Sequence, residues 1–62
     1  MRFIIEPMAC DNAAFEHEPA SEIARILRKV AKAVERGDEL GLLVDSNGNT
    51  VGSWRVEADW QF

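Results

Sequence analysis

The residues of this chain that could do chemistry are few and lie apart in the sequence. His17 stands between two carboxylates, Glu16 and Glu18, a setting in which an imidazole can act as a general base or bind a metal. Either role needs further groups converging from elsewhere, and the sequence has no tyrosine and no glycine-rich phosphate loop. We therefore expect His17 to be a surface residue, and we expect no catalytic site and no cofactor.

Metal binding is equally poorly supported by the sequence. A structural zinc site needs four Cys or His ligands, whereas the chain has one of each. Cys10 has no basic neighbour in sequence that would lower its pKa, so we expect an inert, packed thiol. The segment from Asp45 to Asn49 resembles the start of a calcium loop, but Thr50 and Val56 stand where an EF-hand needs Gly and Glu. We interpret that segment as a turn and predict no metal site.

Positive charge is concentrated in one short stretch. Five of the seven Lys and Arg residues recur there at i, i+3, i+4, i+7 and i+11, which places them on one face of a helix. This basic stripe consists of Arg25, Arg28, Lys29, Lys32 and Arg36. It could bind phosphates or an acidic protein surface. The alternative is an ordinary solvated helix face, and no aromatic residues are interleaved to stack bases.

The overall composition limits the class of protein. The chain has 62 residues and a net charge of −4, and 47% of it is hydrophobic, which indicates a single folded domain, 1–62. A net acidic chain disfavours generic nucleic-acid binding, and eleven acids against seven bases give little support for DNA mimicry. So short a chain has a marginal core, which favours a partner or a homodimer. Without an apolar run long enough for a signal peptide or a membrane span, we expect a soluble, cytoplasmic protein.

The element best supported by the sequence is a helix of about 17 residues. Pro19 suits its first position, and Gly37 supplies a left-handed stop. Leu27 lies two positions from Arg25, about 200° around the axis, so we expect the apolar and basic faces to be opposed. The apolar positions with helical spacing are Ile23, Ile26, Leu27, Val30 and Val34.

Three strands complete the predicted fold. Asn47-Gly48 between two strand-like runs is a strong hairpin signal. Gly41 and Gly52 flank this hairpin and allow a helix or a ring to approach the sheet closely. The fold class is therefore α+β, a three-stranded antiparallel sheet packed on one helix in the order β-α-β-β. The expected strands are Arg2–Glu6, Leu40–Asp45 and Thr50–Glu57.

A single helix cannot cover both faces of this sheet. Alternation places Leu40, Leu42 and Val44 on one side and Leu43 on the other, while Trp54 and Val56 share a side. We expect Ile4 and Leu43 to line an open apolar face, the kind of surface that binds a partner or a second copy. Near it, Trp60 and Phe62 could anchor an interface or fold back onto the core.

Several segments together resemble a group of short proteins encoded by bacteriophages and prophages. They are Asp11-Asn-Ala-Ala-Phe15, Pro19-Ala-Ser-Glu-Ile-Ala-Arg-Ile-Leu27 and Asp45-Ser-Asn-Gly-Asn-Thr-Val-Gly52. The resemblance covers about residues 9 to 52 and brings no catalytic residues. It implies a phage accessory protein in the cytoplasm of a bacterial host. By analogy, small proteins of this kind block host defence by binding a defence protein, as anti-CRISPR proteins do.

Our leading prediction is a non-catalytic, stoichiometric protein-binding inhibitor of a host defence system, of anti-CRISPR type. The residues we expect to bind the partner are the basic stripe together with Trp60 and Phe62. One alternative is a small nucleic-acid-binding or regulatory module that uses the basic stripe. Another is a homodimeric structural protein joined through its sheets.

Overall fold

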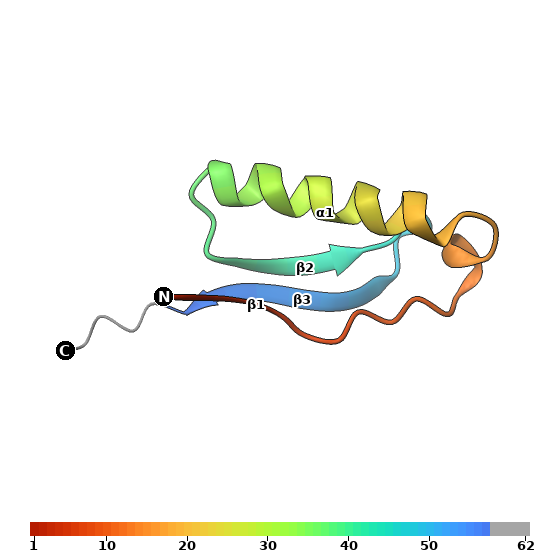
Figure 1. The fold of residues 1–62 in the computed structure, drawn as a ribbon, viewed down its shortest axis with the longest axis horizontal. Helices are drawn as coiled ribbons and strands as arrows, with labels where there is room; N and C mark the ends of the chain where they lie inside the picture. The colour runs from red at the N-terminus through yellow and green to blue at the C-terminus, as the bar shows by residue number, and fades with distance from the viewer. Residues whose placement is uncertain (58–62) are drawn as a thin grey trace.

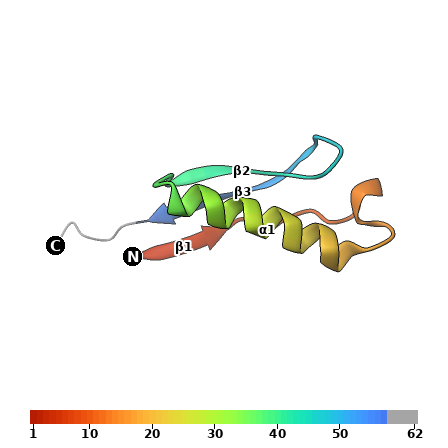
Figure 2. The same ribbon diagram turned by 90° about the horizontal axis from the view of Figure 1, so that it is seen from above.

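The computed structural model describes residues 1–57 of the chain. Three antiparallel strands form one sheet with β3 in the centre, in the spatial order β1-β3-β2. The helix α1 lies along one face of this sheet (Figure 1, and from above in Figure 2). The predicted α+β class is confirmed. In chain order the elements are β1 (Arg2–Ile5), the 3₁₀ turn η1 (Ala13–Phe15), α1 (Pro19–Glu35), β2 (Leu40–Val44) and β3 (Thr50–Glu57).

Local signals place both ends of α1 where the sequence predicts. Pro19 is the first helical residue, a position where its missing N–H costs no helical hydrogen bond. Beyond the last turn, Gly37 has φ +102°, and its N–H donates to the carbonyl of Val34 at 3.0 Å. Because a side chain is strained at this φ, glycine is the residue that ends the helix cleanly.

The β2–β3 hairpin closes through a longer loop than a two-residue Asn-Gly turn. The N–H of Gly48 donates to the carbonyl of Asp45 at 3.0 Å, and Asp45 N–H donates to Asn49 O at 2.9 Å. Gly48 has φ +85°, whereas Asn47 keeps a negative φ. The loop is therefore a β-turn that ends in a left-handed glycine, a common alternative for hairpins.

The prediction of which sheet face meets the helix is wrong for β2. Leu43 is fully buried in the core, while Leu40 is 73% and Leu42 64% exposed. The register pairs Gly41 with Trp54 and Leu43 with Gly52, so the odd-numbered positions of β2 face α1. The two glycines leave room there for large side chains of the neighbouring strand. The buried core consists of Phe15, Ile26, Val30, Leu43, Val51 and Trp54.

The opposite face of the sheet is correspondingly more polar than predicted. Arg55 in the central strand donates to Glu6 at 2.6 Å and to Glu57 at 2.8 Å, and Arg2 pairs with Glu57 from β1. Of the two residues predicted to line an open apolar face, only Ile4, which pairs with Arg55, lies on this side. Ion pairs cover the β1–β3 half, and the exposed apolar side chains are on β2.

The helix is also rotated relative to the prediction. Leu27 and Val34 are partly exposed beside Phe3, whereas the buried helix residues are Glu22, Ile26 and Val30. Ile26 lies one position from Arg25, about 100° around the axis. The basic stripe is therefore beside the buried face, above β2, and is not opposite to it. The reason is that Glu22 is buried through its polar contacts, which apolar periodicity does not reveal.

Candidate functional site

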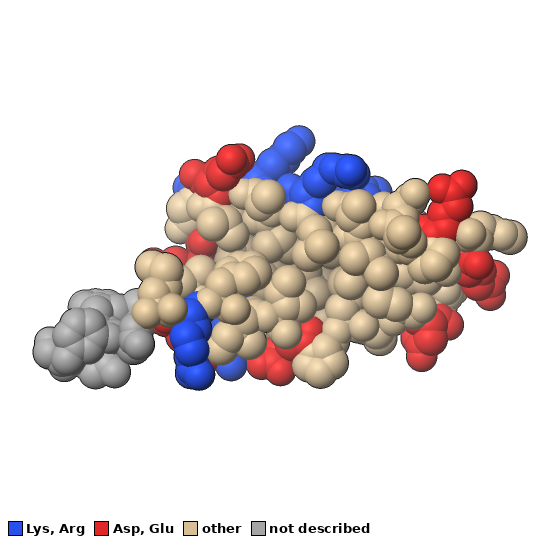
Figure 3. Space-filling view, viewed as in Figure 1, with Lys and Arg blue, Asp and Glu red and all other residues tan. Residues whose placement is uncertain are grey.

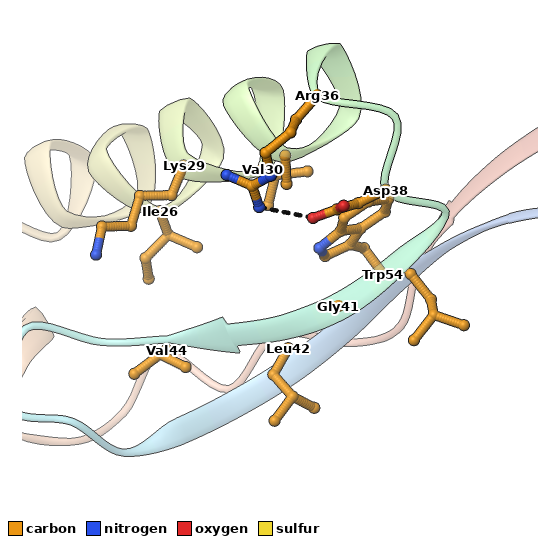
Figure 4. A pocket seen from close by; sticks show the side chains of 11 residues that line it. Ile26, Lys29, Val30, Arg36, Asp38, Gly41, Leu42, Val44 and Trp54 are labelled. Atoms are coloured by element: carbon orange, nitrogen blue, oxygen red, sulfur yellow. Dashed lines mark hydrogen bonds and ion pairs between the residues drawn. The ribbon is translucent and has the colours of Figure 1, made fainter.

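A groove runs between α1 and the outer strand β2. It has a volume of about 270 Å³ and is lined from above by the helix and from below by β2 (Figure 4). Its inner wall is apolar, with Ile26, Val30 and the ring of Trp54, and its rim carries Lys29 and the ion pair of Arg36 with Asp38. A groove with an apolar wall and an unpaired lysine at its rim suits a ligand that is partly apolar and partly anionic.

The structure places all five cations of the basic stripe on the same side of α1, as their spacing predicts. Lys and Arg side chains gather over the helix, while many Asp and Glu side chains lie at the end of the molecule where α1 begins (Figure 3). In the part of the chain that the structure describes, Arg28, Lys29 and Lys32 form no ion pair. These three side chains can meet an anionic partner without first breaking an internal bond.

The two ends of the stripe are held by internal partners. Arg25 donates to both oxygens of Glu22, with Nε–Oε1 3.0 Å and Nη2–Oε2 2.8 Å, and Nη2 also reaches the carbonyl of Val44 at 3.2 Å. Arg36 donates to Asp38 at 2.6 Å. Because Val44 belongs to β2, the contact from Arg25 shows that the stripe reaches the edge of the sheet.

Glu22 is the residue of this region that sequence reasoning missed. Its carboxylate is buried and accepts from Arg25 and from the N–H of Ser46, at 2.7 Å, in the hairpin loop. The hydrogen bond from Arg25, aided by that from Ser46, holds the pKa of Glu22 below its usual value although burial opposes this. Glu22 therefore ties the first half of α1 to the hairpin. The available signal was its i, i+3 spacing from Arg25.

Asp45 organises the hairpin loop. Its buried carboxylate accepts from the N–H groups of Asn47 and Asn49, at 2.9 and 2.8 Å, and from the side-chain amide of Asn12 at 2.6 Å. Burial raises the pKa of Asp45, but the bonds from Asn49, Asn12 and Asn47 outweigh it, and the pKa is lowered. These hydrogen bonds are those of a carboxylate that closes a turn on its own loop. The turn interpretation is confirmed.

The outer edge of β2 is open. The N–H of Val56 donates to the carbonyl of Glu39 at 2.8 Å, and Gly41 and Leu43 continue this set of hydrogen-bonded pairs with β3. In an antiparallel pair the alternate residues direct their N–H and C=O away from the neighbouring strand. Leu40 and Leu42 therefore point their backbone groups outward, where no strand within residues 1–57 pairs with them.

The indole of Trp54 borders the groove. The ring is only 3% exposed, yet its Nε1–H donates to no residue within the described part of the chain. The ring lies over Gly41, where an added Cβ would be 2.6 Å from Nε1. Gly41 thus has the role predicted for it, the close approach of a ring. The indole nitrogen lies on the side of the ring that faces the groove (Figure 4).

The remaining candidates within residues 1–57 do not come together in a site. Glu16, His17 and Glu18 are exposed, and among residues 1–57 no group of three His, Cys, Asp or Glu side chains could hold a metal ion. Cys10 is half-buried, and its thiol donates to the carbonyl of Met8 at 3.4 Å. Trp60 and Phe62 lie outside the described residues.

Over residues 1–57, no helix has the length and apolar character needed to cross a membrane. In comparisons with known proteins, the sequence matches no family model, no curated protein and no solved structure.

Proposed function

We propose that this chain is a non-catalytic protein-binding module that acts by occupying an acidic surface of its partner. One observation carries the proposal: cations without internal partners lie next to an open strand edge with exposed leucines. Arg28, Lys29 and Lys32 supply the charge, and Leu40 and Leu42 supply the apolar contact. Interfaces combine a desolvated apolar centre with a polar rim, which is the composition of this surface.

The engagement of the buried acidic groups supports a binding role over a catalytic one. Glu22 and Asp45, the two buried carboxylates, have their pKa values lowered and their oxygens occupied by internal donors. A general acid or base near neutral pH needs a pKa shifted upward and a free path to its substrate. Both carboxylates serve the fold.

The resemblance to short phage and prophage proteins supports a finer version of the proposal. In that version the partner is a subunit of a bacterial defence complex, and the chain inhibits it stoichiometrically in the host cytoplasm. A small chain suits this role, because one bound copy inactivates one target and no catalytic turnover is needed.

The test is affinity capture of bacterial lysate proteins on the immobilised chain, followed by mass spectrometry and a phage-protection assay. Lys32→Glu should abolish specific capture, because it reverses charge in the centre of the stripe. The matched control is the double variant Ala9→Glu/Ala20→Glu, which changes net charge equally at exposed positions elsewhere. If Lys32→Glu and the control retain the same proteins equally well, the basic stripe is not the binding surface and the proposal fails.

The free cations also favour a second candidate, a nucleic-acid-binding module. Its signature is an affinity whose logarithm falls with the logarithm of salt concentration, by about 0.9 for each phosphate neutralised. Fluorescence anisotropy with a labelled duplex at low salt measures this directly. Absence of binding at low salt would remove this candidate and leave the protein-binding proposal intact.

A further inference from the structure

The free edge of β2 has the geometry of a strand-docking site. Leu40 and Leu42 direct N–H and C=O groups outward, and both side chains are exposed. Exposed edges of this kind accept an extended peptide as an additional strand, with main-chain hydrogen bonds giving affinity and alternate side chains giving specificity. A guest strand would become the fourth strand of the sheet, beside β2.

The surroundings of the edge specify the side chains of the guest. Residues of the guest that face α1 would enter the groove, where Arg36 is already paired with Asp38 and, within residues 1–57, the groups without an internal partner are the cation Lys29 and the indole N–H donor of Trp54 (Figure 4). Such positions favour Asp or Glu. The intervening residues of the guest would lie next to Leu40 and Leu42 on the other face, which favours aliphatic side chains.

Internal contacts show that the stripe can act on the backbone of this edge. Val44 lies two residues beyond Leu42, so its carbonyl also points away from β3. This carbonyl accepts a hydrogen bond from Arg25 at 3.2 Å. Arg25 therefore already closes the end of the edge nearest the hairpin loop. The backbone groups of Leu40 and Leu42 are left for a guest of a few residues.

Charge argues against a second copy of this chain as the guest. An antiparallel pairing of β2 with β2 about a two-fold axis would place both helices on the same face of a continuous sheet. The two basic stripes would then face each other across the junction, with the unpaired cations of both copies close together. Like charges so placed disfavour association, whereas an acidic guest neutralises the same groups.

We propose that the β2 edge binds an extended acidic segment of a partner protein as a fourth strand, with alternating acidic and aliphatic residues. The acidic side chains enter the groove between α1 and β2, and the aliphatic ones pack beside Leu40 and Leu42. This inference rests on the proposed protein-binding function and names the chemistry of its partner.

The probe is a synthetic octapeptide of alternating Glu and Val, acetylated and amidated at its ends. Two control peptides match it: one has Lys in place of Glu, and one carries N-methyl groups on alternate residues so that it cannot pair. Hydrogen exchange of the Leu40 and Leu42 amides is followed by NMR. At a peptide concentration about ten times its Kd, exchange at both amides should slow by about tenfold, because only the unbound fraction exchanges.

Two variants test the edge and the charge separately. Leu42→Pro removes an N–H that points away from β3, so the sheet should tolerate it while guest pairing is lost; Leu42→Ala keeps the N–H and should still pair. Circular dichroism and thermal unfolding check that both variants fold. Lys29→Glu should weaken binding by at least about fivefold at low salt, and the difference should shrink at high salt.

The outcomes separate this inference from the broader proposal. Binding of the Glu peptide without slower exchange at Leu40 and Leu42, or equal binding of the Lys peptide, overturns strand addition, although capture of a partner through the basic stripe would still stand. No binding of the Glu peptide at low salt overturns it as well. Dimerisation that Leu42→Pro abolishes would instead assign the edge to a second copy.

Discussion

The contact between Gly41 and Trp54 gives the most exacting test of how the core is packed. A Cβ added at Gly41 would lie 2.6 Å from Nε1 and 3.0 Å from Cε2 of the Trp54 ring, closer than real contacts allow. The ring is 3% exposed, and its centroid lies 5.8 Å from that of Phe3, so it cannot move aside without disturbing the core. Gly41→Ala should therefore destabilise the fold.

The size of the effect follows from two opposing terms. Overpacking a well-filled core costs about 1–3 kcal/mol. Replacing glycine within a strand returns about 0.5–1 kcal/mol, because the unfolded chain loses freedom. The net loss for Gly41→Ala is about 1 kcal/mol, which in a domain of this size lowers Tm by about 4–8 °C.

Gly52→Ala is the matched control for Gly41→Ala. Its Cβ would meet the Cδ1 methyl of Leu43 at 3.0 Å, a side-chain end that can rotate, and the carbonyl of Pro7 at 3.3 Å. Thermal unfolding followed by circular dichroism should give a lower Tm for Gly41→Ala than for Gly52→Ala. The NMR signal of the Trp54 indole N–H should shift only in Gly41→Ala. Equal stability of Gly41→Ala and the unmodified protein would refute the packing argument.

Three further predictions concern stability. Leu43→Ala should cost about 2–5 kcal/mol in urea unfolding and Leu40→Ala less than about 0.5, since only Leu43 is buried; similar losses would contradict the assigned sheet faces. Gly37→Ala should lower the free energy of unfolding by about 1–2 kcal/mol, because alanine is strained at the φ of +102°. An unchanged Tm would contradict the left-handed conformation at residue 37. The pKa of Asp45 in the folded protein lies below its usual 3.8, so its contribution to the free energy of unfolding is complete above pH 3.8 and is lost as the pH falls through the lower folded value. Asp45→Asn should therefore flatten the pH dependence of stability in this acidic range. An unchanged slope would exclude Asp45 as the source of that dependence.

Local signals in the sequence were sufficient to predict the helix and the three strands, although not the 3₁₀ turn η1. Pro19 and Gly37 mark the ends of α1, and β3 runs over Thr50–Glu57 as predicted. The sheet faces were harder to predict, because Leu40, Leu42 and Val44 alternate onto one side of β2 and only Leu43 lies on the other. The volume of the side chains determines which face of the sheet meets α1. Gly41 and Gly52 lie on the core side, where Trp54 and Leu43 need the space. Counting apolar residues misses the room that a glycine leaves.

The candidate site was predicted in part. Spacing alone placed the five cations on one face of a helix, and the structure has them there. That face lies above β2 and not opposite the core, because Glu22 takes a buried position through bonds to Arg25 and Ser46. Sequence periodicity registers apolar burial and cannot register a buried carboxylate. The groove and the open edge arise only when β2 is known to be the outer strand.

The place of β1 in the sheet has a consequence for how the molecule opens. Strands β2 and β3 meet through a short loop, whereas the pairing of Arg2 with Glu57 joins residues 55 positions apart. Closing so long a loop is entropically costly, so the hairpin can form early and β1 must attach late. We expect partial opening of the folded state to begin at the same strand, β1. Detachment of β1 would expose the edge of β3 that pairs with β1, while the pairing of β2 with β3 and the outer edge of β2 would stay unchanged.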